Sequence, residues 1–306
     1  MKILVISSNL IGDTVLSTGV IEHFFKKHPN SKFTFLIGPT SAQIYENFPG
    51  MEKTIIIEKK KFNFHWINIY LASRKEKWDL VIDLRSSIIS YFLNTKKRYI
   101  FKKNPKIHHI KQLTKSFNLN SEKLHIYTSK SEEKKARENI DKNYRHIVIF
   151  PGGNWDPKIW PVEKYNYLLK NLLEKFKNIR FIIVGSSNER IKYYEKIKEN
   201  LPKETFIDIM GESLTLTSAY MKFSDLFIGN DSGLMHLSVA SKLKTIALFG
   251  PTNDIHYGHK SKNSFVIRTN ENYDYFKKIN IDKKKSYMIS IKTDQILNVI
   301  LKNKLL

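Results

Sequence analysis

Short apolar segments alternate with amphipathic helical patterns twice along this chain, and this alternation restricts the fold more than any other feature. A first series of strand-like segments lies at 2–6, 32–37, 53–57, 80–84 and 98–101. A second series lies at 146–150, 180–184, 205–207, 226–228 and 245–249. Strands that alternate with helices form parallel sheets with helices on both faces. The sequence therefore predicts the α/β class.

The two series predict two Rossmann-like domains that face a central cleft. A charged helix and turn at 131–144 joins them. We expect an N-terminal domain over 1–140, a C-terminal domain over 141–285, and a final helix within 286–306 that packs back on the N-terminal domain. Ligands of open parallel sheets lie beyond the carboxyl ends of the strands, so the loops that follow the strands are the places to look for a site.

Composition excludes several classes of protein. The chain of 306 residues has no cysteine, which excludes disulfides and thiolate metal sites. Its first apolar run is too short for a signal peptide, and no apolar stretch reaches the roughly 20 residues that a membrane span needs. We therefore expect a soluble, cytoplasmic protein.

The net charge is +23, and eight basic residues, two histidines and no acid lie between Lys96 and Lys115. Two interpretations are open. Lys, Ile and Asn are abundant throughout, as in the product of an AT-rich genome. Alternatively, the segment forms a surface for anionic lipid, phosphorylated glycan or nucleic acid.

The segment 227–252 predicts an anion-binding edge. A short apolar strand is followed by a polar turn, and a helix opens at Asp231-Ser232-Gly233. A second strand ends at Gly250-Pro251. Helix N-termini bind anions through unpaired N–H groups and the positive end of the dipole, so a phosphorylated ligand is the natural occupant. Taken singly, Ser232 can be a helix cap, His236 a satisfied buried histidine and Thr252 a turn residue.

A second candidate phosphate site follows the strand at 146–150. Gly152 and Gly153 let the backbone approach a ligand closely, and Lys158 offers a compact positive charge. The alternative is an ordinary loop with a solvated lysine. Glu189 is either an acid in the first turn of a helix or a partner for ribose hydroxyls.

The loop after the first strand contains Gly12 and Asp13 but lacks Gly-x-Gly-x-x-Gly, which disfavours a nicotinamide or flavin enzyme. Asp13 is either a helix N-cap or a carboxylate that accepts a proton from a substrate hydroxyl. Asp83 ends a buried strand and is a weak candidate. No Asp-x-Asp motif occurs, and we assign His256 and His259 to a flexible surface loop in preference to a metal site.

Taken together, these segments resemble the heptosyltransferase-type enzymes of glycosyltransferase family 9, which have the GT-B fold. Three motifs carry the resemblance, which spans most of 1–260: Lys2-Ile-Leu-Val-Ile with Gly12-Asp13 and Thr14-Val-Leu-Ser-Thr18; Pro151-Gly-Gly with Lys158-x-Trp160-Pro161; and Gly229-Asn-Asp-Ser-Gly-Leu-Met-His236 with Phe249-Gly-Pro-Thr252. The family commonly has Asp-Thr-Gly in place of Asp231-Ser232-Gly233, and Thr-Asp-Pro in place of Thr252-Asn253-Asp254. The match is poor after Gly38 in the first domain, so the identity of the acceptor does not transfer.

The resemblance implies inverting, metal-independent transfer of a sugar from a nucleoside diphosphate donor, commonly ADP-heptose, to a lipopolysaccharide core or lipid A acceptor. Asp13 would be the base, and Lys158 with the helix start at Ser232 would hold the diphosphate. Donor contacts are expected from Gly12, Gly152, Gly153, Asn154, Glu189, Asp231, Ser232, Gly233, His236, Gly250 and Thr252. Weak acceptor candidates are Lys97, Arg98 and Asp83.

No metal and no cofactor is expected. The expected partners are the nucleotide-sugar and an anionic glycolipid, with peripheral contact at the inner leaflet of the inner membrane and no nucleic acid. Two rival functions remain open: a GT-B enzyme of the epimerase kind that modifies the nucleotide-sugar alone, and a basic nucleic-acid-binding protein. The second predicts tight, salt-sensitive binding to DNA or RNA, but the sequence has no evident helix-turn-helix, RRM or zinc pattern.

Overall fold

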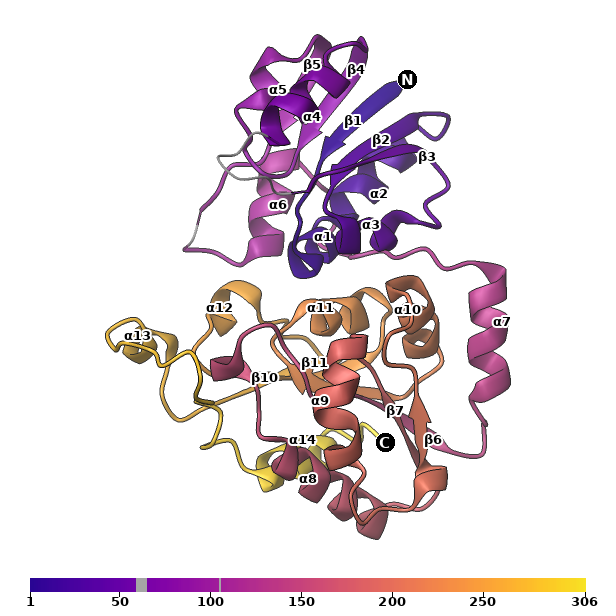
Figure 1. Cartoon of the computed structure of the whole chain (residues 1–306), viewed down its shortest axis with the longest axis vertical. Helices are drawn as coiled ribbons and strands as arrows, with labels where there is room; N and C mark the ends of the chain where they lie inside the picture. Colours follow the sequence, from indigo (N-terminus) through magenta and orange to yellow (C-terminus); the bar gives the residue numbers. More distant parts are fainter. Residues whose placement is uncertain (59–64, 105) are drawn as a thin grey trace. The chain divides into compact units, whose positions relative to one another are not determined.

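A computed structural model describes residues 1–58, 65–104 and 106–306 of the chain. The chain forms two compact α/β units, Met1–Tyr127 (unit 1) and Thr128–Leu306 (unit 2) (Figure 1). Each unit has a parallel sheet of its own. In the described part of the chain, no helix combines the length and the apolar character that crossing a membrane requires.

Unit 1 contains a five-stranded sheet of order β3-β2-β1-β4-β5. Its strands are β1 (Lys2–Ile6), β2 (Lys32–Ile37), β3 (Met51–Ile56), β4 (Trp78–Asp83) and β5 (Thr95–Ile100). Its helices are α1 (Ile11–Leu16), α2 (Thr18–Lys27), α3 (Pro39–Ala42), η1 (Gln43–Tyr45), α4 (His65–Ser73), α5 (Ile89–Phe92) and α6 (His109–Phe117). The central strand β1 is buried after its first residue, as expected for a parallel strand covered on both faces.

Unit 2 contains a six-stranded sheet of order β11-β10-β9-β6-β7-β8. Its strands are β6 (Arg145–Phe150), β7 (Ile179–Ile183), β8 (Phe206–Asp208), β9 (Leu226–Asn230), β10 (Lys244–Phe249) and β11 (Ser264–Arg268). Its helices are α7 (Lys130–Asn139), η3 (Asp156–Lys158), α8 (Val162–Lys175), α9 (Ser187–Ile197), η4 (Lys203–Thr205), α10 (Leu214–Lys222), α11 (Gly233–Ala240), α12 (Asp254–Tyr257), α13 (Tyr273–Phe276) and α14 (Thr293–Lys302).

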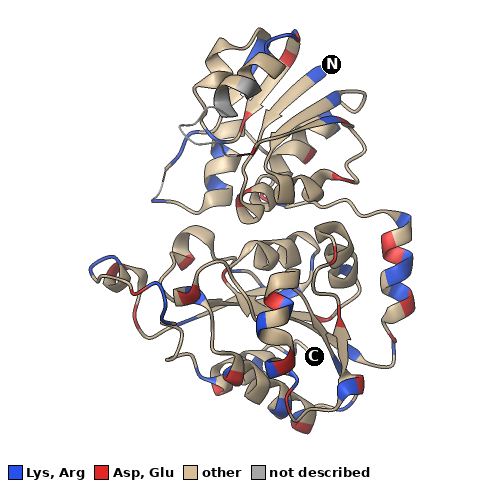
Figure 2. Ribbon diagram, in the orientation of Figure 1, with Lys and Arg blue, Asp and Glu red and all other residues tan. Residues whose placement is uncertain are grey.

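The division between the units falls earlier than the expected boundary at residue 140, because α7 packs on α10 of unit 2. Figure 2 shows that α7 carries charges of both signs. Lys135 pairs with Glu212 at 3.0 Å, and Lys222 pairs with Glu133 at 3.1 Å. These contacts hold α7 to α10 and the preceding turn of unit 2, so α7 groups with unit 2.

The final helix α14 contributes to the core of unit 2. The apolar face of α14 presents Ile296, Leu297 and Ile300 to the core of unit 2, where α14 packs against α8 and β11. Packing of this helix on the first domain stays a prediction. The edge strand β11, which pairs with β10, was not predicted, because only Ser264 and Ile267 in it are buried.

Candidate active site

The carboxyl ends of four neighbouring strands of unit 2 bring most of the expected donor-binding residues to one edge. The strands β10, β9, β6 and β7 are adjacent and parallel. The chain leaves β6 toward β7 on one side and later enters β9 on the other, so a topological switch point lies between β6 and β9. The segments that follow these four strands carry Gly152, Gly153, Asn154, Lys158, Glu189, Asp231, Ser232, Gly233, Gly250 and Thr252.

The side chain of Asn230, at the end of β9, ties the loop after β6 to this edge. It is completely buried. Its Oδ1 accepts hydrogen bonds from the Trp160 amide at 3.0 Å and the Tyr165 hydroxyl at 3.1 Å. Its Nδ2 donates to the carbonyls of Pro151 at 3.2 Å and Gly152 at 2.8 Å. Asn230 therefore fixes both ends of the glycine loop, a role that was not predicted because nothing in the local pattern reveals a long-range amide contact.

Replacing Asn230 with Ala is expected to lower the free energy of unfolding by about 3 kcal/mol, because several buried polar groups lose their partners. Thermal unfolding followed by circular dichroism measures the change. Asn171→Ala, at a partly exposed position on α8, is the control, with an expected effect of about 0.5 kcal/mol or less. Equal melting temperatures for the two variants would contradict the structural role of Asn230.

Asp231 is a buried carboxylate at the switch point. Burial raises the pKa of Asp231 above its usual range, although the Lys158 ammonium and the Thr252 hydroxyl each lower it in part. Its amide donates to the Leu248 carbonyl at 3.0 Å, which joins the turn to β10. The side chains of Lys158 and Thr252, which follow β6 and β10, thus both act on the pKa of Asp231, which follows β9.

The raised pKa of Asp231 predicts a dependence of stability on pH. A carboxyl with a higher pKa in the folded chain destabilises it above the unfolded pKa of about 3.9, and the penalty grows as the pH rises through the folded pKa. Asp231→Asn removes this penalty. We expect the melting temperature of the variant minus that of the wild type to become more positive, by a few degrees, from about pH 4 to about pH 7. A difference that stays constant or falls with pH would contradict the raised pKa.

Lys158 ends the short helix η3 and is half-buried. Among the described residues, none accepts a hydrogen bond from its ammonium group or lies within ion-pair distance of it. Its charge nevertheless acts on the Asp231 carboxyl. A half-buried cation at the switch point of a parallel sheet, with no close partner in the described part of the chain, is suited to an anionic ligand.

The helix α11 begins beside this cation. Ser232 is its N-cap, and the Ser232 hydroxyl accepts a hydrogen bond from the Met235 amide at 3.3 Å. Both the predicted helix start and the capping interpretation of Ser232 are confirmed. The first N–H groups of a helix have no partner within the helix, so those of Gly233 and Leu234 remain suited to an anion.

One turn into α11, His236 is buried and joined to a second histidine. His236 Nδ1 and His259 Nε2 are 2.8 Å apart, and one ring donates to the other. The assignment of His259 to a flexible surface loop was wrong, because its side chain is buried against α11. Across residues 1–58, 65–104 and 106–306, no three His, Asp or Glu side chains are grouped so that they could hold a metal ion.

Glu189 lies next to the glycine loop. Its carboxylate accepts hydrogen bonds from the Ser186 amide and the Ser186 hydroxyl, both at 2.8 Å, and so forms the capping box of α9. This confirms the first-turn interpretation of Glu189. A Cβ on Gly152 would collide with this carboxylate, so the glycine is needed for close packing inside the protein. Asn154, in the same loop, is exposed.

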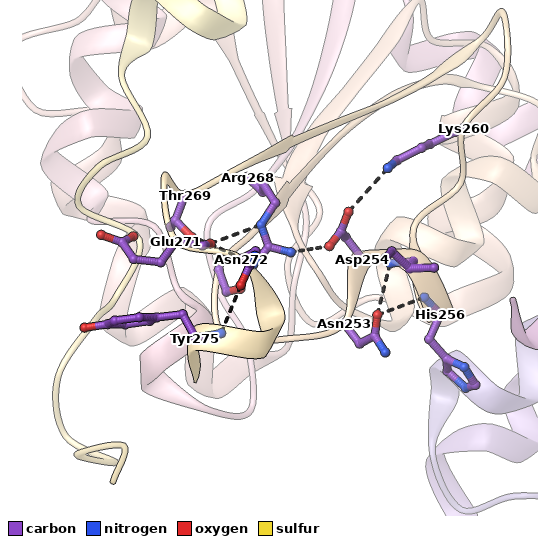
Figure 3. A network of polar contacts seen from close by, with 11 residues as sticks. Asn253, Asp254, His256, Lys260, Arg268, Thr269, Glu271, Asn272 and Tyr275 are labelled. Carbon is purple, nitrogen blue, oxygen red and sulfur yellow. Dashed lines mark hydrogen bonds and ion pairs between the residues drawn. The ribbon is translucent and has the colours of Figure 1, made fainter. Parts of the chain in front are cut away.

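A partly buried ion pair supports the loop that follows β10 (Figure 3). Arg268, the last residue of β11, pairs with Asp254 and donates to the Gly250 carbonyl at 2.8 Å. Asp254 also pairs with Lys260 at 3.3 Å. Buried charges of this kind hold their surroundings in place only while each keeps its partner. The network therefore fixes the loop that contains Gly250 and Thr252.

Asn253, between Thr252 and Asp254, caps α12. Its Oδ1 accepts hydrogen bonds from the amides of Ile255 at 3.1 Å and His256 at 3.2 Å. The departure from the common Thr-Asp-Pro sequence therefore has a local basis, since Asn is a favoured N-cap.

In unit 1, Asp13 follows β1 at the edge where β1 lies between β2 and β4. The helix α1 has Leu10 as its N-cap, so Asp13 is its third residue and the N-cap interpretation is corrected. The Ser8 hydroxyl donates to the Asp13 carboxylate at 3.2 Å and accepts from the Leu10 amide at 3.1 Å. Gly12 lies in the same turn. The carboxylate is half-buried and held from one side by the loop.

The three weak acceptor candidates have different surroundings. Asp83 is completely buried, and its carboxylate accepts from the amides of Arg85 at 2.8 Å and Ser87 at 2.6 Å. Burial raises the pKa of Asp83, and these amides offset only part of the effect. Its carboxylate holds a turn, and its contact with the acceptor stays a prediction. Arg98 donates to carbonyls of the α5 segment, whereas Lys97 is exposed beside the ring of Tyr99.

Comparison with known proteins gives consistent results. The family model described as glycosyltransferase family 9 (heptosyltransferase) matches residues 93–286. Lipooligosaccharide heptosyltransferase 2 of Campylobacter jejuni is 31% identical, with 82% of each chain covered. Among solved structures, a family 9 glycosyl transferase from Veillonella parvula has a TM-score of 0.79 at 20% identity and covers 99% of this chain and 97% of its own. The ADP-heptose lps heptosyltransferase II of E. coli has a TM-score of 0.77 at 18% identity, covering 100% and 99%.

The solved structures bear on the fold and confirm the predicted GT-B class of two parallel-sheet α/β domains. The family model and the Campylobacter relative bear on identity, because the first matches more than half of the chain and the second exceeds 30% identity over most of it. They confirm the resemblance that the three sequence motifs indicated. The chain belongs to glycosyltransferase family 9, the heptosyltransferase family, and is a glycosyltransferase.

Proposed function

We propose that this enzyme transfers a heptose from ADP-heptose to a hydroxyl group of a lipopolysaccharide core acceptor, with inversion and without a metal ion. The observation that carries the proposal is the half-buried ammonium group of Lys158, which has no close partner among the described residues and lies at the switch point of unit 2. The names of the relatives support the choice of donor and acceptor class, since they are heptosyltransferases of lipooligosaccharide and lipopolysaccharide.

Donor binding is assigned to unit 2. The Lys158 ammonium and the first N–H groups of α11, after Ser232, hold the diphosphate. Gly153, Asn154 and the loop from Gly250 to Thr252 line the rest of the donor site, and Glu189 contacts the ribose in addition to its capping role at the start of α9. Asp231 and His236 orient the phosphate-binding turn through their buried contacts.

Acceptor activation is assigned to unit 1. The Asp13 carboxylate accepts the proton of the acceptor hydroxyl while the oxygen of that hydroxyl attacks the anomeric carbon. The bond from this carbon to the diphosphate oxygen breaks, and ADP leaves with the electron pair. Positive charge from Lys158 and the α11 dipole stabilises the negative charge that develops on the diphosphate. A single displacement of this kind inverts the anomeric carbon, and the cationic groups take the place of a metal ion.

The basic character of the chain supports an anionic glycolipid as the acceptor. The net charge is +23. Lys97 and Arg98 are the candidates in unit 1 for contact with acceptor phosphates, and Lys97 is the more exposed of the two. Such an acceptor places the enzyme in the cytoplasm at the inner leaflet.

Incubation with labelled ADP-heptose, with and without a heptose-deficient lipopolysaccharide acceptor, tests the proposal. We expect release of ADP that depends on the acceptor, an inverted linkage in the product by NMR, and the same rate in the presence of a chelator. Release of free, epimerised sugar without acceptor would support the epimerase alternative. Absence of turnover with ADP-heptose would overturn the proposed donor.

A further inference from the structure

The helix α5 of unit 1 and its N-cap residue Ile88 present large apolar side chains to solvent. Ile88, Tyr91 and Phe92 are 73%, 62% and 66% exposed. Their spacing of three and four residues places them on one side of a helical turn. Ile89 and Leu93, on the opposite side, are buried. The exposed side chains therefore project away from the core of the unit.

The neighbouring helix α4 also has exposed apolar side chains on one side and a buried apolar side chain on another. Ile67 and Leu71, four residues apart, are 54% and 45% exposed, whereas Ile69 is buried. Ile69 and Ile89 belong to the same core cluster, so α4 and α5 cover the same face of the sheet (Figure 1). We define the α4–α5 face by its five exposed side chains: Ile67, Leu71, Ile88, Tyr91 and Phe92.

This concentration of apolar side chains differs from the pattern in unit 2. There, exposed apolar residues such as Tyr167, Ile191 and Leu301 come from three different helices, α8, α9 and α14. Single exposed apolar residues are normal on protein surfaces, but adjacent ones that form a patch mark a surface that meets an apolar partner.

Positive charges border the α4–α5 face. The Arg98 guanidinium donates to the carbonyls of Ser90 at 2.8 Å and Leu93 at 3.1 Å and lies 5.9 Å from the ring centre of Tyr91. The exposed residues Arg74 and Lys75 follow the end of α4. The helix α5 itself carries no charged residue (Figure 2).

We propose that the α4–α5 face docks unit 1 on an anionic lipid bilayer. Apolar side chains with basic residues at their border suit the interface of a bilayer, where the first enter the boundary between headgroups and acyl chains and the second meet anionic headgroups. Tyr91 is suited to the boundary between headgroups and acyl chains because its ring is apolar and its hydroxyl is polar. A protein partner could also cover the apolar residues, but the basic residues at the border and the net charge of +23 favour anionic lipid.

Co-sedimentation of the full chain with vesicles tests the proposal. We expect binding to vesicles of phosphatidylethanolamine and phosphatidylglycerol, and much weaker binding to vesicles of phosphatidylcholine. The triple variant Ile88→Ser, Tyr91→Ser, Phe92→Ser is expected to partition at least about tenfold less strongly. The matched control Tyr167→Ser, Ile191→Ser, Leu301→Ser should bind as the wild type does. Wild-type protein that stays in the supernatant, or a triple variant that binds like the control, would overturn the proposal.

A second measurement does not depend on the triple variant. The chain has no cysteine, so Phe92→Cys provides a single site for an environment-sensitive fluorophore. A blue shift on addition of anionic vesicles is expected at this position and not at Ile191→Cys. Equal responses at the two positions would contradict docking through α5.

Light scattering and turnover separate docking on lipid from dimerisation and from the transfer reaction. Light scattering could show that the wild type is a dimer and the triple variant a monomer, while the wild type does not bind vesicles. In that case the face joins two copies of the chain and the proposal is overturned. Turnover with a soluble acceptor should be the same in the wild type and the triple variant. Failure of the docking proposal is therefore distinguishable from failure of the proposed transfer reaction.

Discussion

Asp13→Asn is expected to lower kcat by about 10²–10⁴-fold, the usual contribution of a general base, while leaving the affinity for ADP unchanged. The amide keeps the size of the carboxylate but cannot accept a proton from the acceptor hydroxyl. Asp13 belongs to unit 1, whereas the groups assigned to the diphosphate belong to unit 2, so the two properties separate in one variant. Steady-state transfer kinetics and titration calorimetry with ADP measure them.

The control for this substitution is Asp79→Asn. Asp79 lies near the amino end of β4, on the edge of the sheet opposite to Asp13, where it pairs with Lys96 at 2.6 Å. This variant should keep its turnover, since exposed ion pairs of this kind contribute little. Normal turnover by Asp13→Asn would reject Asp13 as the base.

Lys158→Ala should lower kcat/KM for ADP-heptose by about 10²–10³-fold and weaken ADP binding, because the diphosphate loses its principal positive charge. Lys158→Arg keeps the charge and should recover part of the loss. Removal of the cation also leaves Asp231 without the charge that lowers its pKa, so the buried carboxyl becomes still harder to ionise.

The exposed Lys170→Ala on α8 is the matched control and should behave as the wild type. If Lys158→Ala and Lys170→Ala gave the same ADP affinity and the same kinetics, Lys158 would have no part in holding the diphosphate.

The repeated alternation of strand and helix was enough to predict two parallel-sheet domains, because the central strands are short apolar runs that end in polar or glycine-containing loops. The loops of Gly152, Asp231 and Gly250 could be placed at one edge, since parallel strands share the direction of their carboxyl ends. Assignment of α7 and α14 required tertiary contacts. The helix α7 is highly charged, and its sequence does not indicate which unit contains the residues that pair with it.

The site was predicted less completely than the fold. Residues with recognisable local chemistry, such as Lys158 and Ser232, could be proposed from the motifs. Asn230 and His259 could not, because their roles come from contacts with residues 23 to 79 positions away. The acceptor contact of Asp83 stays a prediction from its place at a strand end, and tertiary structure adds that its carboxylate accepts hydrogen bonds from the next turn of the chain.

The crystal structure of the protein with ADP tests the proposed donor site most directly. We expect a diphosphate within hydrogen-bonding distance of the Lys158 ammonium and of the first amides of α11, after Ser232. A diphosphate bound away from the carboxyl ends of β6 and β9, or an empty site at saturating ADP, would contradict this central claim.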